Sequence, residues 1–225
     1  MKKQSYNIAL IGAGRMGARW AGVIAASKNC SLSLVVDKDA PLGKKVAEVY
    51  GAASSADYTQ AFGEAIDAVF IVTPHKFLYP LAKEALLSGK HVFVEKPGSK
   101  TAEEMRDLIR IAKEKKHALM VGFNYRFFDS IQQAKKIVEH GTIGEVVSIR
   151  IVHGHAGRFG YEKEWRMNKE LAGGGVLMDQ GLHCIDLARW FLQGPITSVF
   201  GSVSNFVWKT RVEDAASLIL KTKAG

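Results

Sequence analysis

Short apolar runs alternate with helical stretches over residues 6–122 of this 225-residue chain. The runs are rich in β-branched residues and have the length of strands, which we expect at residues 7–11, 32–37, 68–72, 91–95 and 118–122. Helices are expected between them, at residues 15–27, 41–50, 76–88 and 102–115. This alternation is typical of a doubly wound parallel sheet built from βαβ units. It predicts an α/β fold with an N-terminal Rossmann domain over residues 1–123.

The predicted helices carry recognisable end signals. Thr101 followed three residues later by Glu104 forms a capping box before the last of these helices. Gly51 and Gly89 stand where helix C-caps are expected.

A second pattern begins after Gly122. A helix is predicted at residues 128–139, an alternating half-buried strand at 145–153, a helix from the glycines at 173–175 to residue 191, and strands at 198–206 and 215–222. We interpret residues 124–225 as a partial α/β domain. Residues 223–225 read as a turn, and three strands would leave an unpaired sheet edge, so a truncated chain is expected.

Composition narrows the class of protein. Hydrophobic residues make up 47% of the chain, which indicates a globular rather than a disordered protein. The net charge of +9 would attract anionic ligands or simply be a solvated surface, and no nucleic-acid-binding motif is present. Cys30 and Cys184 show no CxxC or disulfide pattern, and neither a signal peptide nor a membrane segment is recognisable. A cytoplasmic location is expected.

A glycine-rich motif directly follows the first predicted strand: Gly12-Ala13-Gly14-Arg15-Met16-Gly17. In the GxGxxG pattern the glycines permit a tight turn, close approach of a pyrophosphate and close packing of helix on strand. The helix N-terminus offers backbone N–H groups to phosphates. The pattern alone is weak, but its position between strand and helix favours dinucleotide binding.

Asp37 strengthens this interpretation. It ends the second predicted strand, 20 residues after Gly17, where a carboxylate accepts hydrogen bonds from ribose hydroxyls. The alternative is a simple turn residue. Because a 2′-phosphate would be repelled by Asp37, NAD is favoured over NADP, although Lys38 and Arg15 weigh against that preference.

Two further clusters follow predicted strands: Thr73-Pro74-His75 and Glu95-Lys96-Pro97. Both fall at the carboxyl edge of the sheet, where ligands bind in such folds. Lys96 could contact a substrate oxygen and take part in acid–base chemistry, or be a surface cation that ends a strand.

A fourth cluster runs from Gly173 to Asp186. If this segment is helical, Asp179 and His183 are i,i+4 neighbours, and a carboxylate-oriented imidazole is a plausible proton relay. The alternative is a packed histidine beside a solvated aspartate. Zinc-binding spacings are absent, so no metal is expected.

Together, the glycine loop, Thr73-Pro74, Glu95-Lys96-Pro97, residues 122–127 (GFNYRF) and residues 173–186 resemble the Gfo/Idh/MocA oxidoreductases, the family of glucose–fructose oxidoreductase and inositol dehydrogenase. The resemblance covers residues 6–225. It implies a Rossmann domain followed by an α/β domain with an open mixed sheet that often packs in homo-oligomers. It also implies hydride transfer between NAD(P) and a hydroxyl carbon of a sugar, sugar derivative or cyclitol, with no nucleic-acid or membrane partner.

The resemblance implies roles for individual residues. Lys96 would bind and polarise the hydroxyl, His183 would be the general base or acid, and Asp179 would orient the substrate or His183. The cofactor would be held by Gly12, Gly14, Arg15, Met16, Gly17, Asp37, Lys38, Thr73, Pro74, His75, Glu95 and Lys96. The substrate would be held by Lys96, Tyr125, Arg126, Trp165, Arg166, Asp179 and His183.

The chain departs from the family in two respects. Leu78 stands where many members have a histidine, so His75 is a candidate for that cofactor contact. Members are also usually a hundred or more residues longer.

Residues 157–166 contain Arg158, Lys163 and Arg166, which could meet anionic groups, with Tyr161 and Trp165 to stack on a sugar or base. This looks similar to members that act on nucleotide-linked sugars, and a plain surface loop is the alternative. Two other functions remain open: a glycoside hydrolase that uses NAD transiently, and a non-catalytic dinucleotide-binding module.

Overall fold

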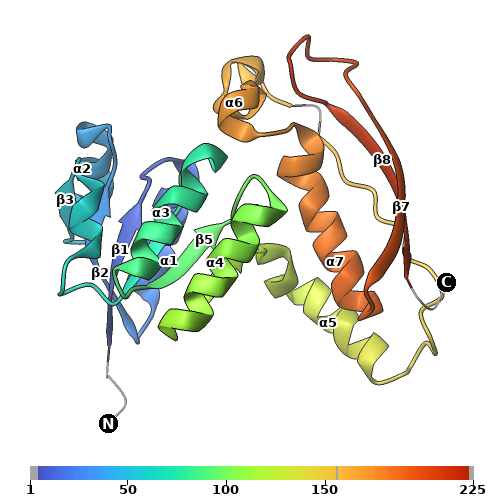
Figure 1. Cartoon of the computed structure of the whole chain (residues 1–225), viewed down its shortest axis with the longest axis horizontal. Coiled ribbons are helices and arrows are strands. Elements are labelled where there is room, and N and C mark those ends of the chain that lie inside the picture. The colour runs from blue at the N-terminus through green and yellow to red at the C-terminus, as the bar shows by residue number, and fades with distance from the viewer. Residues whose placement is uncertain (1–4, 156, 223–225) are drawn as a thin grey trace. The chain divides into compact units, whose positions relative to one another are not determined.

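A six-stranded parallel sheet forms the first unit of the computed structural model, which describes residues 5–155 and 157–222 (Figure 1). The strand order is β3-β2-β1-β4-β5-β6. The strands are β1 (Tyr6–Ile11), β2 (Cys30–Val36), β3 (Ala53–Ser55), β4 (Ala68–Ile71), β5 (His91–Glu95) and β6 (Leu119–Gly122). The five predicted strands are confirmed, and β3 is an addition, because its three residues carry no apolar run.

Four helices connect these strands: α1 (Arg15–Ala26), α2 (Ala40–Val49), α3 (His75–Leu87) and α4 (Ala102–Lys115), together with the short 3-10 helix η1 (Tyr58–Phe62). Their predicted ends agree to within a residue. The Thr101–Glu104 capping box is present, and Gly51 and Gly89 have positive φ angles after α2 and α3. Glycine adopts this left-handed conformation without a steric penalty.

Apolar side chains cover both faces of the sheet. One cluster includes Ile71, Leu78 and Leu108 and packs α3 and α4 against one face. The other includes Leu10, Ala21 and Val46 and packs α1 and α2 against the opposite face. A parallel sheet buried on both faces explains why its strands read as continuous apolar runs.

The strand order reverses direction between β1 and β4, which pair in parallel from Ile8–Ala68 to Ile11–Ile71. Gly12 follows β1, and its backbone lies so close to that of Val72 that an added Cβ would be 2.4 Å from the Val72 carbonyl oxygen. Crevices at such switch points bind ligands in open α/β sheets. The first unit is therefore the Rossmann fold that the sequence predicts.

The second unit begins at Phe123 and is mainly helical. Its α-helices are α5 (Asp129–Glu139), α6 (Lys169–Ala172) and α7 (Leu182–Leu192), preceded by a π-helical turn, η5 (Leu177–Gly181); short 3-10 helices are η2 (Asn124–Phe127), η3 (Tyr161–Lys163) and η4 (Trp165–Met167). Two antiparallel strands, β7 (Ile196–Ser204) and β8 (Ala215–Thr222), form its sheet. The turn predicted at 223–225 lies outside the described residues.

The strand predicted at residues 145–153 is wrong. These residues pair with no strand among the described residues, and Val147 and Val152 are 93% and 83% exposed. Alternation of apolar and polar residues produces a strand only where a neighbour completes the hydrogen-bond ladder. The segment instead lines a groove of about 900 Å³ together with α7 and β8. The described part of the unit contains a two-stranded antiparallel sheet, β7–β8, a part of the open sheet that the resemblance implies.

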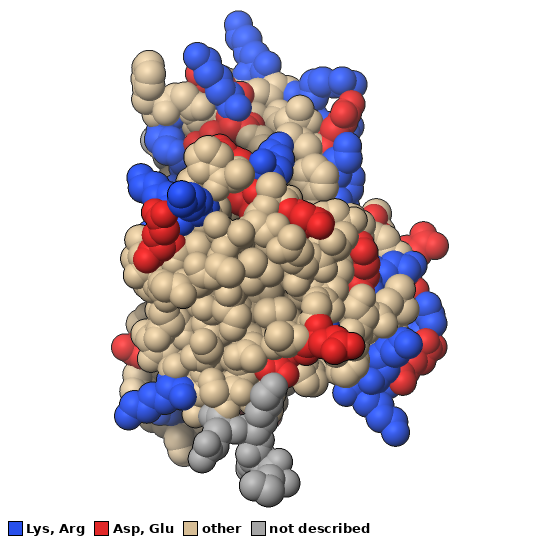
Figure 2. Space-filling view, turned by 90° about the vertical axis from the view of Figure 1, so that its left-hand side faces the viewer, with Lys and Arg blue, Asp and Glu red and all other residues tan. Residues whose placement is uncertain are grey.

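Charged side chains of both signs are interspersed on the side of the molecule shown in Figure 2, around an uncharged central area. The excess of basic residues is thus not gathered into one patch on this face. Among the described residues, no helix combines the length and apolar character needed to cross a membrane.

Candidate active site

The glycine loop has the three steric properties that its motif predicts. Gly12 has a φ of +102°, and a Cβ at Gly17 would lie 1.9 Å from the Gly12 carbonyl oxygen. Gly14 differs, because an added Cβ would meet no atom within 4 Å. Two glycines therefore let the protein pack on itself, whereas Gly14 leaves open space above the start of α1, which a pyrophosphate could fill.

Asp37 is bonded directly to this loop. Its Oδ2 accepts a hydrogen bond from the Ala13 backbone N–H at 2.6 Å, and its Oδ1 accepts one from Asp39 at 2.9 Å. The carboxylate is half-buried, and each oxygen keeps acceptor capacity for a further donor. Lys38 and Arg15 are both exposed. Asp37 thus orders the glycine loop through its bond to Ala13.

Thr73, Pro74 and His75 lie at the carboxyl end of β4. Pro74 is the N-cap of α3 and His75 its first residue, 3% exposed. The buried Thr73 hydroxyl has no hydrogen-bond partner among the residues that the structure describes, an arrangement that favours a partner from a ligand or water. Leu78 is a fully buried core residue. Open space at Gly14, the Asp37 acceptor and the Thr73 hydroxyl together fit a nicotinamide dinucleotide.

Glu95 and Lys96 follow β5, where sequence analysis predicts cofactor contacts. The Glu95 side chain is buried and accepts hydrogen bonds from the Trp20 indole at 2.7 Å and from the Lys96 backbone N–H at 3.2 Å. Lys96 itself is half-buried. Sequence reasoning missed Trp20, although its place on α1, three residues after Gly17, was a signal that it lies near the glycine loop.

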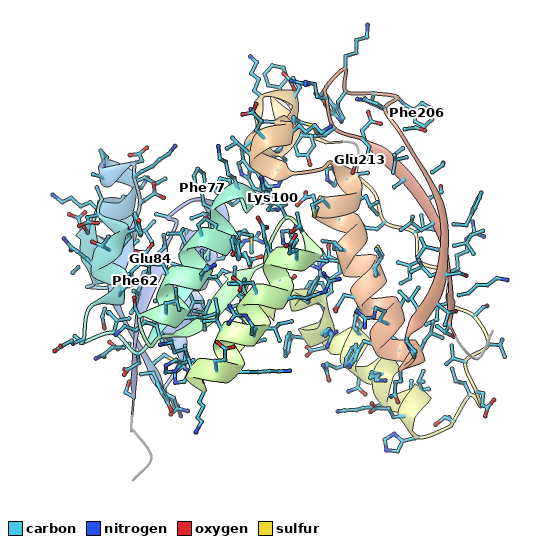
Figure 3. The ribbon with its side chains drawn as sticks, in the orientation of Figure 1. Phe62, Phe77, Glu84, Lys100, Phe206 and Glu213 are labelled. Atoms are coloured by element: carbon cyan, nitrogen blue, oxygen red, sulfur yellow. The ribbon has the colours of Figure 1, made fainter. Side chains whose placement is uncertain are left out.

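The glycine triplet of the second unit packs directly on Glu213. A Cβ at Gly175 would lie 1.9 Å from the Glu213 carbonyl oxygen, which accepts from the Val176 N–H at 2.9 Å. The Glu213 side chain, labelled in Figure 3, accepts from the Leu177 N–H at the start of η5. The triplet thus anchors the helical segment that carries the two predicted catalytic residues, and Glu213 is a second residue that sequence reasoning missed.

Asp179 lies in the π-helical turn and is 6% exposed. Its Oδ2 accepts from the Gln180 amide at 3.0 Å and lies 3.4 Å from Arg166 Nε. This turn, in which hydrogen bonds join residues five apart, runs directly into α7, so Asp179 and His183 lie on one helical segment, although the part that carries Asp179 is π-helical rather than α-helical.

His183 is the second residue of the regular helix α7 and is 5% exposed. Its ring stacks on Tyr125, with centroids 4.1 Å apart and planes inclined by 10°, and meets the edge of Phe123. Burial raises the pKa of the Tyr125 hydroxyl, with smaller contributions from Cys184 and Asp179. Tyr125, a predicted substrate contact, is therefore a neutral ring that fixes the imidazole plane.

The remaining predicted substrate contacts are engaged within the second unit. Arg126 forms a two-pronged ion pair with Asp186, which raises the pKa of the guanidinium. Arg166 bridges Asp179 and Glu164 and lies over the Trp165 ring, 4.6 Å from its centroid. Among the described residues, no group of three or more His, Cys, Asp or Glu side chains could hold a metal ion.

Two family models match the chain. Residues 6–123 match the model "Oxidoreductase family, NAD-binding Rossmann fold" of the Gfo/Idh/MocA proteins, and residues 131–225 match the Gfo/Idh/MocA C-terminal domain. The two matched ranges adjoin the boundary at Gly122 between the two units.

Similar proteins include two curated dehydrogenases. The D-glucoside 3-dehydrogenase of Escherichia coli K12 is 32% identical over 87% of this chain and 56% of its own length. The inositol 2-dehydrogenase of Rhizobium meliloti is 30% identical over 96% of this chain and 65% of its own length. The chain thus spans less than two thirds of these relatives.

A solved structure of levoglucosan dehydrogenase, in complex with NADH and levoglucosan, superposes with a TM-score of 0.87. It is 27% identical and covers 98% of this chain and 64% of its own. On the family match, the strand order and the glycine loop, the chain belongs to the Gfo/Idh/MocA family of oxidoreductases, whose N-terminal domain is an NAD-binding Rossmann fold.

Proposed function

We propose that this chain provides the cofactor-binding domain and substrate-binding residues of an NAD-preferring dehydrogenase or reductase that acts on a hydroxyl carbon of a sugar or cyclitol. The observation that carries the proposal is the Asp37 carboxylate held against the glycine loop by Ala13. A carboxylate fixed there favours an unmodified ribose and repels a 2′-phosphate. The names of the relatives, which act on glucosides and inositol, support a polyhydroxylated substrate.

In this proposal each unit supplies separate groups to the reaction. Bound NAD supplies the hydride acceptor. The Lys96 ammonium donates a hydrogen bond to the substrate hydroxyl oxygen and stabilises the negative charge that develops as its proton leaves. An imidazole nitrogen of His183 accepts that proton in oxidation and returns it in reduction, while Asp179 orients the reacting groups.

The charges of the second unit favour an uncharged sugar or cyclitol over a nucleotide sugar. Arg158 and Arg166 both pair with Glu164, and Arg166 also faces Asp179. Arginines that already bind carboxylates would have to give up these ion pairs to bind a phosphate. This observation leads us to set aside the nucleotide-linked substrates that the composition of residues 157–166 suggests.

Titration of the chain with NADH and NADPH, followed by nicotinamide fluorescence, tests the cofactor part. We expect tighter binding of NADH, and we expect Asp37→Asn to narrow the difference between the two cofactors. Glu114→Gln, an exposed acid paired with Arg110 on α4, is the matched control and should leave both affinities unchanged. A folded chain that binds neither cofactor would refute the proposal.

A panel of neutral sugars and cyclitols tests the reaction. NADH formation should require Lys96 and His183, and Lys96→Met and His183→Asn should lower kcat, whereas Lys113→Met on α4 should not. Turnover that requires NAD but yields no net NADH would instead favour the transient oxidation of a glycoside hydrolase. Binding of NADH with no turnover of any panel member would favour the non-catalytic module.

We also propose that the β7–β8 sheet contacts a second copy of the protein. Val199, Phe200, Val203 and Ile219 are each more than half exposed, which is unusual for adjacent strands of a monomer. Phe200→Glu should lower the molar mass measured by analytical ultracentrifugation, and an unchanged mass would exclude this face as the contact.

A further inference from the structure

Trp20 links the cofactor-binding helix to the residue proposed for catalysis. It lies on α1, which begins at the glycine loop, and its indole N–H donates to Glu95 Oε1 at 2.7 Å. The other oxygen of the same carboxylate accepts from the Lys96 backbone N–H at 3.2 Å. The buried Glu95 carboxylate therefore connects α1 to the backbone of Lys96.

The surroundings fix both partners of this hydrogen bond. The Trp20 ring packs on Phe93 and Phe70, with centroids 4.5 and 5.6 Å away, and those two rings stack on each other. On the adjacent strand, Gly122 pairs with Glu95, and a Cβ there would lie 3.3 Å from Glu95 Oε1 and 2.9 Å from the Phe93 ring. The missing side chain of Gly122 thus leaves the room that the carboxylate occupies.

We propose that Trp20 is a positioning residue, which sets the conformation of Lys96 by holding the Glu95 carboxylate. The inference rests on the proposed function, because it takes Lys96 as the residue that meets the substrate oxygen. A hydrogen bond to an ionised acceptor is shorter and stronger than one between neutral groups. A carboxylate that lost the indole would turn toward other donors and release the Lys96 N–H.

Three variants separate the hydrogen bond from the packing. Trp20→Phe removes the N–H donor and keeps an aromatic ring against Phe93. In the wild-type protein the Trp20 indole and the Lys96 backbone N–H each donate to a different oxygen of Glu95. Glu95→Gln leaves only one acceptor oxygen for these two donors. Phe70→Leu is the matched control, because it loosens the same aromatic cluster and leaves the Trp20–Glu95 bond in place.

The primary readout does not require cofactor or substrate. Lysines of the apo chain are reductively methylated with ¹³C-formaldehyde, and the Lys96 signal is assigned by its loss in Lys96→Arg. We expect Trp20→Phe and Glu95→Gln to move the Lys96 dimethylamine resonance and sharpen it toward the exposed lysines, whereas Phe70→Leu leaves it unchanged. An unchanged Lys96 resonance in Trp20→Phe or Glu95→Gln would overturn the proposal. An equal change in Phe70→Leu would also overturn it, because it would mean that Trp20 acts only through packing in the aromatic cluster.

Kinetics with a substrate from the panel give the second readout. Trp20→Phe should lower kcat on the order of tenfold, which corresponds to ~1.4 kcal/mol, while the NADH affinity measured by fluorescence stays within about twofold. Loss of NADH affinity without a change in kcat would overturn the positioning role. If no substrate is found, the proposed function fails, yet the lysine signals still decide whether Trp20 positions Lys96.

Discussion

The two units organise their candidate functional groups by different means. In the first, strands, glycines and backbone N–H groups hold Asp37 and Glu95, and the sheet behind them is covered on both faces. In the second, ion pairs and ring stacks between side chains hold Asp179 and His183, and the two-stranded sheet leaves large apolar side chains such as Phe200 and Ile219 exposed. We infer that the first unit is an autonomous scaffold, whereas the second depends on a few long-range side-chain contacts.

Gly17→Ala is the sharpest test of the site in the first unit, which is held mainly by backbone contacts. Because its Cβ would lie 1.9 Å from the Gly12 carbonyl, the loop must move, and we expect a loss of more than ~3 kcal/mol in unfolding free energy together with loss of NADH binding. Urea denaturation and fluorescence titration measure the two effects.

Gly14→Ala is the partner experiment. Its Cβ would meet open space, so stability should be unchanged while the NADH Kd rises on the order of tenfold, ~1.4 kcal/mol. Equal destabilisation by Gly14→Ala and Gly17→Ala would contradict our view that Gly17 is required for packing within the protein whereas Gly14 only leaves room for the cofactor.

Large-to-small substitutions compare the two cores. Leu108 on α4 is fully buried, and Leu108→Ala should cost about 3 kcal/mol, within the range found for such cavities. Leu187 on α7 keeps 8% of its surface exposed, so Leu187→Ala should cost less, about 2 kcal/mol. A larger loss at Leu187 than at Leu108 would contradict our view of the second unit as the less tightly packed one.

Asp186→Asn tests the importance of side-chain ion pairs in the second unit. The substitution removes the charge that the Arg126 guanidinium binds with two nitrogens, and we expect a loss of about 1–2 kcal/mol. NADH affinity should not change, because the pair lies wholly within the second unit. A neutral result in thermal denaturation would mean that η2 and α7 are held by ring packing alone.

The first unit could be predicted from sequence almost completely, because its parallel strands are buried on both faces and its helices carry explicit capping signals. β3 escaped notice since Ala53–Ser55 contains no apolar run. At the site, the glycine motif and Asp37 could be predicted because they occur at a fixed spacing from each other and from the first two strands. The Trp20–Glu95 contact joins residues 75 positions apart, and no local pattern encodes it.

The second unit was harder to predict, because its structure depends on contacts that alternation and periodicity do not report. Residues 145–153 alternate as a strand should, yet find no ladder partner among the described residues. A helix is predicted from the glycine triplet to residue 191, and its first turn, which carries Asp179 and follows the contacts of Gly175 with Glu213, is π-helical rather than α-helical. The ion pair of Arg166 with Asp179 joins residues 13 positions apart, and no local pattern in the sequence predicts it.

A smaller effect, confined to the first unit, concerns His117, whose pKa is lowered below its ordinary value of 6.5, chiefly by burial and then by the nearby charges of His91, Lys115 and Lys90. Its buried Nδ1 has no hydrogen-bond partner among the described residues, and its ring meets the edge of His91. As the pH falls through about 6.5, the unfolded chain binds a proton at this histidine before the folded protein does. The folded state therefore loses stability below that pH, whereas above it the contribution of His117 to folding stability is fully present.

His117→Gln should therefore lessen the fall in Tm between neutral and mildly acidic pH, whereas His140→Gln, an exposed position after α5, should leave it unchanged. An identical pH dependence of Tm in wild type and His117→Gln would mean that the acid sensitivity of the first unit arises from other groups.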